Sequence, residues 1–354
     1  MSTRYGASRA EVDALLREWG EPRYRGDQLW DALYRQQAPL DHATALPRAL
    51  RTRLVDALPL ALDVVTELTA HDAMTTKWLW ACARDGAQIE TVLMRYPERA
   101  TVCVSSQAGC AMACTFCATG QAGFERHLDA GEIVEQVVRA AHSSPQRVGN
   151  VVFMGMGEPL ANYDNTWAAV ERIHDDLGVS ARRITVSTVG VAPAIRRLAG
   201  EVLPVTLAVS LHAASDAERD ALVPLNRRYP IAEVLDAAAE FAGAKGRRVT
   251  FEYACIEGVN DSPAQAEALG RLLGAFPGVG GSHVNLIPLN PTDGFGGHAP
   301  APPSLRAFAD RLRAHGVTAT VRRNRGTDIA AACGQLRSRV AMPRGPAPSA
   351  TMER

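Results

Sequence analysis

The strongest constraint on the fold is an alternation of short β-rich runs with amphipathic helical runs, which begins near residue 100. The helical runs include AGEIVEQVVRAAH and LRAFADRLRAHG, in which apolar residues recur at helical spacing. The β-rich runs between them are NVVFMGMG, RITVST, VTLAVSLH, VTFEYACI, HVNLIPLN and TATVRR. Strictly alternating strands and helices predict a parallel sheet, either doubly wound or closed into a full or partial barrel.

The first hundred residues follow other patterns. Ser8 and Glu11 form a capping-box signature, and apolar stripes at helical spacing follow it to about residue 60. Next come two β segments, TKWLWACA and QIETVLMRY, separated by the turn RDGAQ. We predict a helical accessory domain at 1–60, a hairpin-like connector at 61–100, an α/β barrel domain at 101–340 and a disordered Pro-rich tail at 341–354.

Composition favours a soluble globular protein. The chain has 354 residues, of which 47% are hydrophobic and 21% are charged, values that suit one α/β barrel with an appended module. The sequence has no run of eighteen apolar residues, and MSTRYGASRAEVD lacks the apolar core of a signal peptide. We therefore expect a cytoplasmic protein with no membrane partner.

The net charge of zero hides an uneven distribution of arginine. Residues 301–354 contain ten arginines against only Asp310, Asp328 and Glu353. Such a basic end is able to face phosphate groups, but an ordinary solvated surface has the same composition. Charge alone leaves both interpretations open.

Three cysteines, Cys110, Cys114 and Cys117, lie within the stretch SSQAGCAMACTFCATG, and the seven cysteines form no regular disulfide framework. A structural zinc site usually has four ligands, and His127 is awkwardly spaced to be the fourth. A cubane iron–sulfur cluster held by three thiolates leaves one iron with an open position. The loop therefore favours a cluster that binds a further molecule, with zinc and plain burial as alternatives.

Polar residues stand at or just past the ends of four predicted strands. In parallel α/β folds these ends gather at one edge, where ligands bind. Each residue could instead be a cap or turn residue, but the repetition over four strands favours a binding site. The residues are Gly157, Glu158, Ser187, Ser210, His212 and Asn290.

The CxxxCxxC loop followed by βα units resembles the radical S-adenosylmethionine (SAM) superfamily. In that superfamily the open iron binds SAM, and reductive cleavage yields a 5′-deoxyadenosyl radical. Over about residues 10–340, further segments resemble the RlmN and Cfr family of dual-cysteine RNA adenine methyltransferases, which methylate carbon 2 or carbon 8 of an adenine in 23S rRNA. These segments are ETVLMRYPERATVCVSSQAGCAMACTFCATGQAGF, FMGMGEPLANYDN, ITVSTVGV, LAVSLHA, NLIPLNP and RGTDIAAACGQL.

This resemblance implies a partial (β/α)6-type radical-SAM barrel, one 4Fe-4S cluster and a role for each matching residue. Glu90 matches a proton acceptor, Cys333 the cysteine that becomes methylated, and Cys103 its disulfide-forming partner. The matching cluster ligands are Cys110, Cys114 and Cys117. The matching SAM-binding residues are Gly157, Glu158, Ser187, Ser210, Leu211, His212 and Asn290.

The resemblance also implies a reaction in which two SAM molecules are consumed per turnover. Carbon 2 of adenine is electrophilic, so direct methyl transfer from SAM fails; Cys333 first takes a methyl group, which a radical then activates to join the base. Cys103 attacks the Cys333 sulfur to release the product. We expect 23S rRNA as partner, with tRNA as a possible second substrate, a flavodoxin-like electron donor and a monomeric enzyme.

Several alternatives stay open at the level of sequence. Methylation of carbon 8, a radical-SAM reaction on a substrate other than RNA, and a non-catalytic metal-binding RNA-associated protein all fit parts of the pattern. Without the resemblance, Cys103 and Cys333 would be interpreted as packing residues and Glu90 as a surface acid. Cys82 and Cys255 match no motif and are expected in the core.

Overall fold

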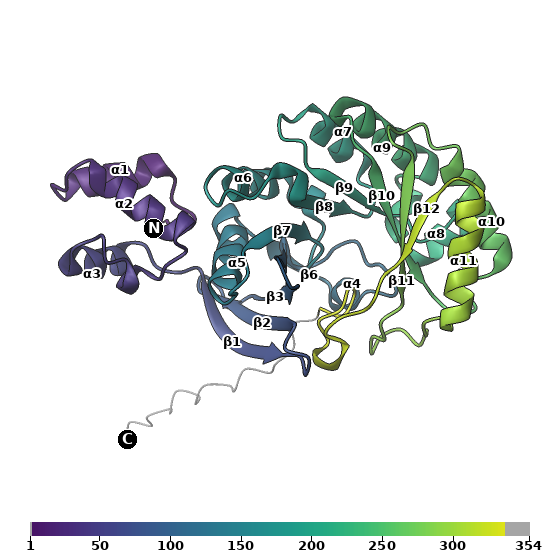
Figure 1. The fold of residues 1–354 in the computed structure, drawn as a ribbon, viewed down its shortest axis with the longest axis horizontal. Coiled ribbons are helices and arrows are strands. Elements are labelled where there is room, and N and C mark those ends of the chain that lie inside the picture. The colour runs from purple at the N-terminus through teal and green to yellow at the C-terminus, as the bar shows by residue number, and fades with distance from the viewer. Residues whose placement is uncertain (1, 337–354) are drawn as a thin grey trace, which may run out of the picture.

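A ten-stranded sheet forms the centre of the molecule, in the order β1-β2-β3-β4-β7-β8-β9-β10-β11-β12 (Figure 1). This computed structural model describes residues 2–336, so the predicted tail lies outside the described residues. The strands are β1 (Leu62–Thr69), β2 (Thr75–Cys82), β3 (Gln88–Arg95), β4 (Ala100–Cys103), β7 (Val148–Phe153), β8 (Ile184–Thr188), β9 (Thr206–Ser210), β10 (Val249–Cys255), β11 (Ser282–Pro288) and β12 (Thr318–Val321).

The strands from β4 to β12 run parallel, whereas β1 to β4 pair antiparallel. The predicted α/β partial barrel is therefore confirmed, and β12 extends the parallel run beyond the six strands from β4 to β11. Within the described residues β1 pairs only with β2 and β12 only with β11, so the sheet stays open. β1 to β3 continue the same sheet, so strand pairing does not separate residues 61–100 from the barrel.

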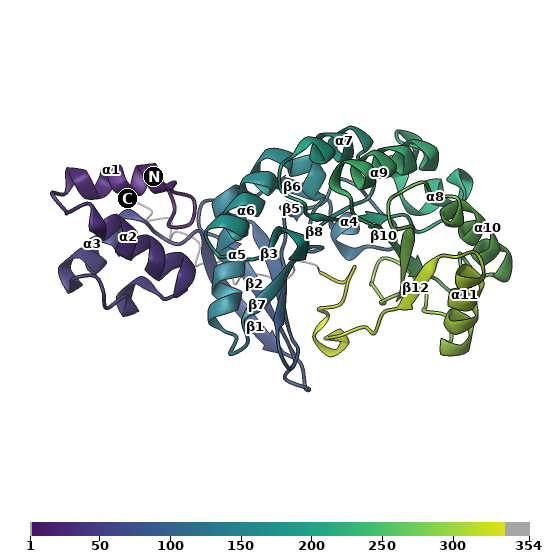
Figure 2. The same ribbon diagram turned by 45° about the horizontal axis from the view of Figure 1, so that its top comes forward.

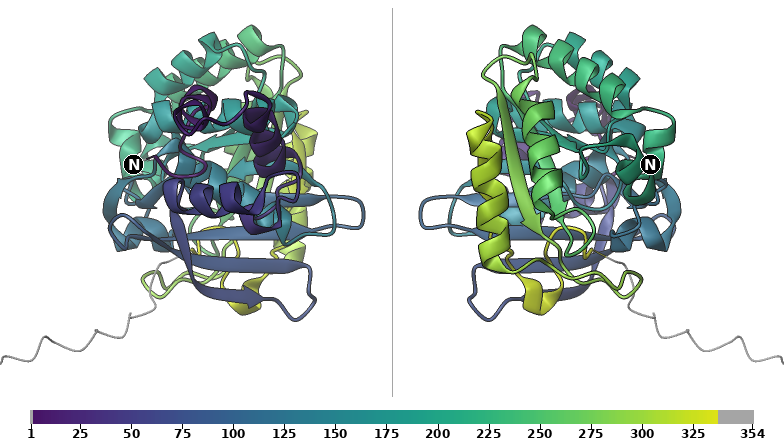
Figure 3. Two further views of the ribbon diagram at one scale, coloured as in Figure 1. Left: turned by 90° about the vertical axis from the view of Figure 1, so that its left-hand side faces the viewer. Right: turned by 90° about the vertical axis from the view of Figure 1, so that its right-hand side faces the viewer.

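Helices cover the outer face of the parallel part of the curved sheet, and both views in Figure 3 show them arched over it. Where the connection between parallel strands is a helix, its apolar face packs on the sheet, as βα units require. These helices are α5 (Ala130–His142), α6 (Tyr163–Asp175), α7 (Ala192–Gly200), α8 (Asp216–Leu222), α9 (Ile231–Lys245), α10 (Pro263–Gly274) and α11 (Pro302–Ala314). Short 3-10 turns occur at Leu40–His42, Pro159–Asn162, Ala181–Arg183, Pro224–Arg227 and Thr327–Ile329.

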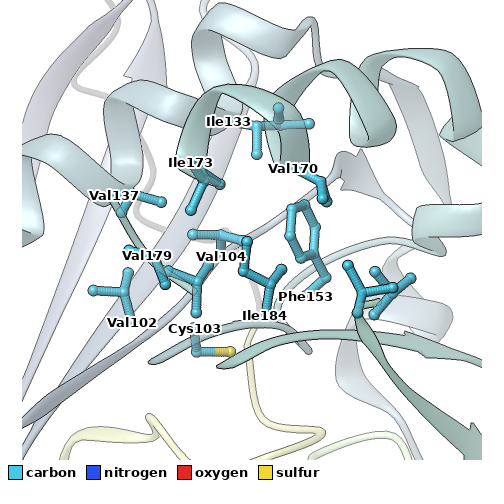
Figure 4. Packing of buried hydrophobic residues seen from close by; sticks show 14 of the residues in the cluster. Val102, Cys103, Val104, Ile133, Val137, Phe153, Val170, Ile173, Val179 and Ile184 are labelled. Carbon is cyan, nitrogen blue, oxygen red and sulfur yellow. The ribbon is translucent and has the colours of Figure 1, made fainter. Parts of the chain in front are cut away.

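The core between β4 and the helices is closely packed (Figure 4). Val102 and Val104 contribute from the β4 end, Ile133 from α5 and Ile173 from α6, and each is at most 1% exposed. Burying an aliphatic side chain of this size stabilises the fold by about 1.5–3 kcal/mol. Cys103 alternates with the two valines along the chain, so its side chain projects from the opposite face of the sheet.

The N-terminal helices α1 (Arg9–Glu18), α2 (Tyr24–Trp30) and α3 (Arg48–Ala57) form a small module at one end of the molecule (Figure 2). The predicted capping box is present at the start of α1. A π-helical turn, Asp31–Arg35, continues α2. The module meets the barrel through the Trp30 indole, whose Nε1 donates to Asp176 Oδ1 at 2.8 Å.

A two-stranded sheet of β5 (Gln107–Gly109) and β6 (Phe124–His127) and the short helix α4 (Ala118–Ala122) lie inside the mouth of the barrel. Along the chain, β5 precedes the three-cysteine loop, and α4 and β6 follow it. None of the described helices has both the length and the apolar character that a membrane crossing needs.

Candidate active site

The loop that carries Cys110, Cys114 and Cys117 is held tightly at both ends. The Cys110 backbone N–H donates to Gly123 O at 2.7 Å, and a side chain at Gly109 would overlap that carbonyl. Cys114 is buried, and the other two thiols are half-buried. Burial raises the pKa of Cys110 to about 12, and burial followed by the neighbouring thiols raises the pKa of Cys114. The Cys110 and Cys114 thiols therefore stay protonated unless a metal draws the protons off.

The three thiols suit a cluster better than one ion. Among residues 2–336, no three His, Cys, Asp or Glu side chains converge as ligands of a single metal ion. A cubane cluster takes each thiolate on a different iron, so its ligands surround the cluster instead of meeting at one point. The donor set of this loop fits an iron–sulfur cluster on that ground.

A cavity opens beside this loop at the carboxyl ends of the parallel strands. Its wall includes most of the residues that the sequence placed at strand ends, together with two of the three cysteines. Cys110 and Leu211 are not part of this wall, and Leu211 is fully buried, with its backbone N–H on Glu252 O at 3.0 Å. The predicted residues that line the cavity are Cys114, Cys117, Gly157, Glu158, Ser187, Ser210, His212, Asn290 and Cys333.

Gly157 allows the chain to turn into this cavity. Its φ is +100°, and a Cβ at this position would lie 2.6 Å from Gln107 Cβ. Both the backbone conformation and the close approach require glycine. Gln107 in turn accepts from the Glu158 backbone N–H at 2.8 Å, which fixes the turn.

Glu158 is a buried carboxylate at the cavity wall. Its two oxygens accept backbone N–H groups, one from Leu160 at 3.0 Å and the other from Val189 at 2.9 Å. Burial raises its pKa to about 7, although these hydrogen bonds act in the opposite direction and lower it. A cationic amine in the cavity would stabilise the ionised form, so the site suits an ammonium group.

His212 is neutral. Burial and then the charge of Arg219 lower its pKa to about 3. Its Nδ1 accepts from the Ala254 backbone N–H at 3.0 Å, which leaves the ring proton on Nε2. Phe116, from the cysteine loop, packs edge-on against the imidazole with ring centroids 4.8 Å apart. The histidine therefore offers a hydrogen-bond donor and an apolar ring, and no charge.

Asn290 connects the cavity with Cys333. Its Nδ2 donates to the Cys333 carbonyl oxygen at 3.0 Å, while its buried Oδ1 has no protein partner. A buried unpaired acceptor costs about 1–3 kcal/mol, a cost that a bound donor group removes. Together with Glu158, this acceptor fits the ammonium group of an amino acid such as SAM.

A second cavity lies on the other side of Cys333. Cys103 lines it, and Figure 4 shows the Cys103 sulfur directed away from Ile133 and Ile173. Met154, Ile287 and Cys333 line both cavities. Cys333 therefore lies in the wall that the two cavities share.

The two cysteines differ in their surroundings. Cys103 is 7% exposed, and burial raises its pKa to about 12, with the nearby Cys333 adding to the shift. Cys333 is accessible through the cavities, yet enough protein surrounds it for burial to raise its pKa, which the Arg322 guanidinium opposes. The Cys333 thiol is thus close enough to Cys103 to affect its ionisation.

Basic residues surround the second cavity, in the part of the chain that the sequence marked as arginine-rich. Arg325 lies over the Tyr96 ring at 4.6 Å, and Arg99 lies over the same ring at 4.6 Å. Arg322 and Arg323 also line this cavity. The cavity therefore presents positive charge around the two reactive thiols.

Glu90 lies in β3 as a buried residue, and not as a surface acid. Its carboxylate is 3.0 Å from Lys77 Nζ. In the described part of the chain it is not among the residues lining either cavity, although Val92, which shares its face of the strand, lines the second. Glu90 therefore lies on the same face of the sheet as Val92, but it does not line the cavity.

The sequence analysis did not identify two charged residues that lie in or beside the site. Glu252, inside the apolar run VTFEYACI, lines the first cavity and accepts from Asn285 Nδ2 at 2.8 Å. Lys77, inside TKWLWACA, pairs with Glu90. In both runs a charged residue interrupts an apolar strand, and this is the signal that identifies such positions, since buried charges need partners.

The comparisons with known proteins agree with this geometry. Residues 104–268 match the model of the radical SAM superfamily. The chain is 56% identical over 351 residues to a probable dual-specificity RNA methyltransferase RlmN of Parafrankia sp. (strain EAN1pec), covering 93% of this chain and 90% of the relative. It is 53% identical to another of that name from Rhodococcus jostii (strain RHA1), covering 92% of each. A radical SAM methyltransferase crystal structure from Sphaerobacter thermophilus superposes with a TM-score of 0.90 at 49% identity, covering 95% of this chain and 99% of that one.

Proposed function

Because the chain belongs to the RlmN family of radical SAM RNA methyltransferases, we propose that it methylates carbon 2 of an adenine in 23S rRNA through an S-methylated Cys333. The observation that carries this proposal is the position of Cys333 in the wall between two cavities. A residue in that position is able to receive a methyl group from one cavity and deliver it to the other.

The first cavity is the proposed binding site of the cofactors. Cys110, Cys114 and Cys117 would hold one 4Fe-4S cluster, and Glu158 and Asn290 would bind the SAM ammonium group. When bound, the cluster and SAM supply a methyl group and a radical that abstracts hydrogen. The protein itself orients Cys333, through Asn290 on its carbonyl oxygen.

The second cavity is the proposed binding site of the target base. The Cys333 thiolate takes a methyl group, and the resulting S–CH₂ carbon becomes bonded to carbon 2 of adenine as a thioether. Glu90 takes the proton from carbon 2, and the Cys103 thiolate attacks the Cys333 sulfur. The S–CH₂ bond breaks, and its electron pair and a proton complete the new methyl group. The unpaired electron that bond formation leaves on the ring would return to the oxidised cluster, and a Cys103–Cys333 disulfide remains. A flavodoxin-like donor supplies the two electrons that reduce it.

The basic rim supports RNA as the molecule that enters the second cavity. Arg322, Arg323 and Arg325 line it, and guanidinium groups bind phosphates and stack on bases. An enzyme that acts on a base must take that base out of its stack, so a cavity with a cationic rim is the expected form.

The test compares two cysteine variants of anaerobically reconstituted protein. C333A should retain the cluster, gain no methyl group and form no covalent RNA species. C103A should still become methylated at Cys333 and should then remain covalently joined to the RNA. C255A, in a buried cysteine outside the site, is the matched control and should turn over normally.

The assay reads the modified nucleoside by mass spectrometry, which separates 2-methyladenine from 8-methyladenine. Transcripts of 23S rRNA and of tRNA are tested side by side, because the relatives' names include dual specificity. A C103A protein that turns over like the unaltered enzyme, or one that is methylated at Cys333 but never joined to RNA, would contradict the mechanism.

A further inference from the structure

Lys77 is an unusual residue in this protein. The chain has 36 arginines and only two lysines, and Lys77 is 8% exposed within β2. Burying an ammonium group costs several kcal/mol unless partners compensate for the lost hydration. The partners of Lys77 therefore indicate why the residue is there.

Its Nζ joins two parts of the proposed site. It lies 3.0 Å from Glu90 Oε1 and donates to the carbonyl oxygen of Ala330 at 3.1 Å. Ala330 precedes Cys333 by three residues and has a positive φ of +49°, a conformation that non-glycine residues adopt rarely. One ammonium group thus contacts both the proposed proton acceptor and the loop that carries the proposed methyl carrier.

Strand pairing places these groups on one face of the sheet. In the register, Lys77 faces Val92 on β3, and Val92 faces Cys103 on β4. Glu90 is two residues from Val92 and so shares its face. Lys77, Glu90 and Cys103 therefore project to the same side, toward the interior of the barrel.

The backbone of Glu90 is fixed independently of Lys77. The Ser105 hydroxyl donates to the Glu90 carbonyl oxygen at 2.6 Å and accepts from the Met156 N–H at 2.9 Å. The Cys333 loop is also held at other points, because Ala118 N–H donates to Gly334 O at 2.8 Å. Lys77 is thus not needed to keep either segment in place by itself, but it joins the two.

A lysine suits this position better than an arginine. The ammonium group is a compact charge whose three donors point in separate directions, whereas the planar guanidinium group matches the two oxygens of one carboxylate. Here the acceptors belong to different chain segments. Lys77 also lines a further cavity with Ala118, Ala330 and Gln335.

We propose that Lys77 is a positioning residue, which keeps the Glu90 carboxylate aligned with the Cys333 loop while the RNA adduct is resolved. The inference rests on the proposed function, since it assigns a residue to one of its steps. Lys77 acts through Glu90, because the same ammonium group holds the carboxylate at 3.0 Å and the Ala330 carbonyl oxygen at 3.1 Å. Methylation of Cys333 does not need Glu90, so the two half-reactions should respond differently.

The experiment measures both half-reactions in K77M, K77R and the matched control K245M, in which the second lysine is changed on the distant helix α9. S-methylation of Cys333 is followed by mass spectrometry, methyladenine by nucleoside analysis, and the covalent adduct on a denaturing gel. K77M should methylate Cys333 within about twofold of the unaltered enzyme, form methyladenine at least about tenfold more slowly, and accumulate adduct. K77R, which keeps the charge, should recover part of the rate, and K245M should match the unaltered enzyme.

A double variant keeps the test informative if K77M fails to fold. K77M/E90Q leaves neither charge unpaired, and it should be as slow as E90Q alone, because Lys77 has no further effect once the carboxylate is gone. Additive losses, equal losses in both half-reactions, or a K77M enzyme of normal rate would overturn the proposal. An unaltered enzyme that forms neither methylated Cys333 nor methylated RNA would instead overturn the proposed function.

Discussion

At the scale of single residues, the protein sets ionisation states by burial more than by ion pairing. Glu158 and His212 line the same cavity and have opposite shifts: burial raises the pKa of the acid to about 7 and lowers that of the histidine to about 3. In both cases burial favours the neutral form of the side chain. The cavity wall therefore carries little charge of its own before the cofactor binds.

His212 makes stability depend on pH. Its folded-state pKa of about 3 lies below its ordinary value of 6.5, so between these values the unfolded chain binds more protons, and acidification favours unfolding. Relative to H212N, the unaltered protein should lose about 2 kcal/mol of unfolding free energy between pH 7 and pH 5. Urea titrations at several pH values measure this difference.

Asparagine is the substitution of choice because it tolerates the positive φ of +62° at this position. H142N, which changes an exposed histidine on α5, is the control and should not reproduce the loss of about 2 kcal/mol between pH 7 and pH 5. The burial argument would be refuted if the difference in unfolding free energy between H212N and the unaltered protein did not change from pH 7 to pH 5.

At the scale of elements, local sequence signals predicted the strands and helices well. The run AGEIVEQVVRAAH coincides with α5, because the capping box of Asp129 and Glu132 starts the helix locally. TATVRR contains β12, since β-branched residues favour a strand there. The expectation that strand-end residues share a cavity is also confirmed for Ser187 and Asn290.

Long-range contacts are what the sequence could not show. No local sequence pattern predicts the π-helical turn Asp31–Arg35. The pattern around Lys77 predicts a strand but gives no sign of the residue's partners. The Lys77–Ala330 and His71–Asp328 contacts join positions more than 250 residues apart, so no periodicity records them. For the same reason, sequence left open whether the arginines near the C-terminal end face solvent or a site.

The segment after β12 should contribute to RNA affinity through charge. Arg323 is exposed and lines the second cavity. R323A should weaken RNA binding several-fold at low salt, and it should reduce the salt-dependence slope of log K by about one, because one phosphate contact is lost. Filter-binding titrations from low to physiological salt measure both quantities.

Arg271 on α10 provides the control for R323A. It is an exposed arginine that pairs with Glu267 at 3.1 Å, away from the second cavity. R271A should leave the slope unchanged. Identical salt dependences for R323A and the unaltered protein would show that this segment does not contact phosphates.

At the scale of the whole molecule, Arg172 adds a second attachment of the accessory module to the barrel, beside the Trp30–Asp176 hydrogen bond. Arg172, on α6, donates to the carbonyl oxygens of Tyr5, Gly6 and Ala7. Hydrogen bonds to a charged group contribute about 1.5–3 kcal/mol. R172A should therefore loosen residues 2–57 without disturbing the cluster loop.

Hydrogen exchange followed by mass spectrometry tests this expectation, with faster exchange in residues 2–57 and unchanged exchange in β8 to β10. R197A is the control, since Arg197 pairs with Asp164 at the surface and lies over the Tyr163 ring at 3.8 Å, and both partners belong to α6 and not to the accessory module. Equal acceleration throughout the molecule would mean that Arg172 stabilises the whole fold and not the attachment of the module.

The open sheet has a consequence for substrate entry. In a closed barrel, widening the mouth would break a ladder of backbone hydrogen bonds. Here, within the described residues, pairing stops at β1 and at β12, and the chain after β12 crosses the opening on single hydrogen bonds. Asp328 Oδ2 accepts from the His71 N–H, and the Ala330 carbonyl oxygen accepts from Lys77 Nζ. The same segment is held by the Ala118 N–H on Gly334 O and by Asn290 Nδ2 on Cys333 O, so a folded RNA that enters here meets scattered bonds and not a continuous ladder. Because this segment carries Cys333, any displacement of it would also move the proposed methyl carrier.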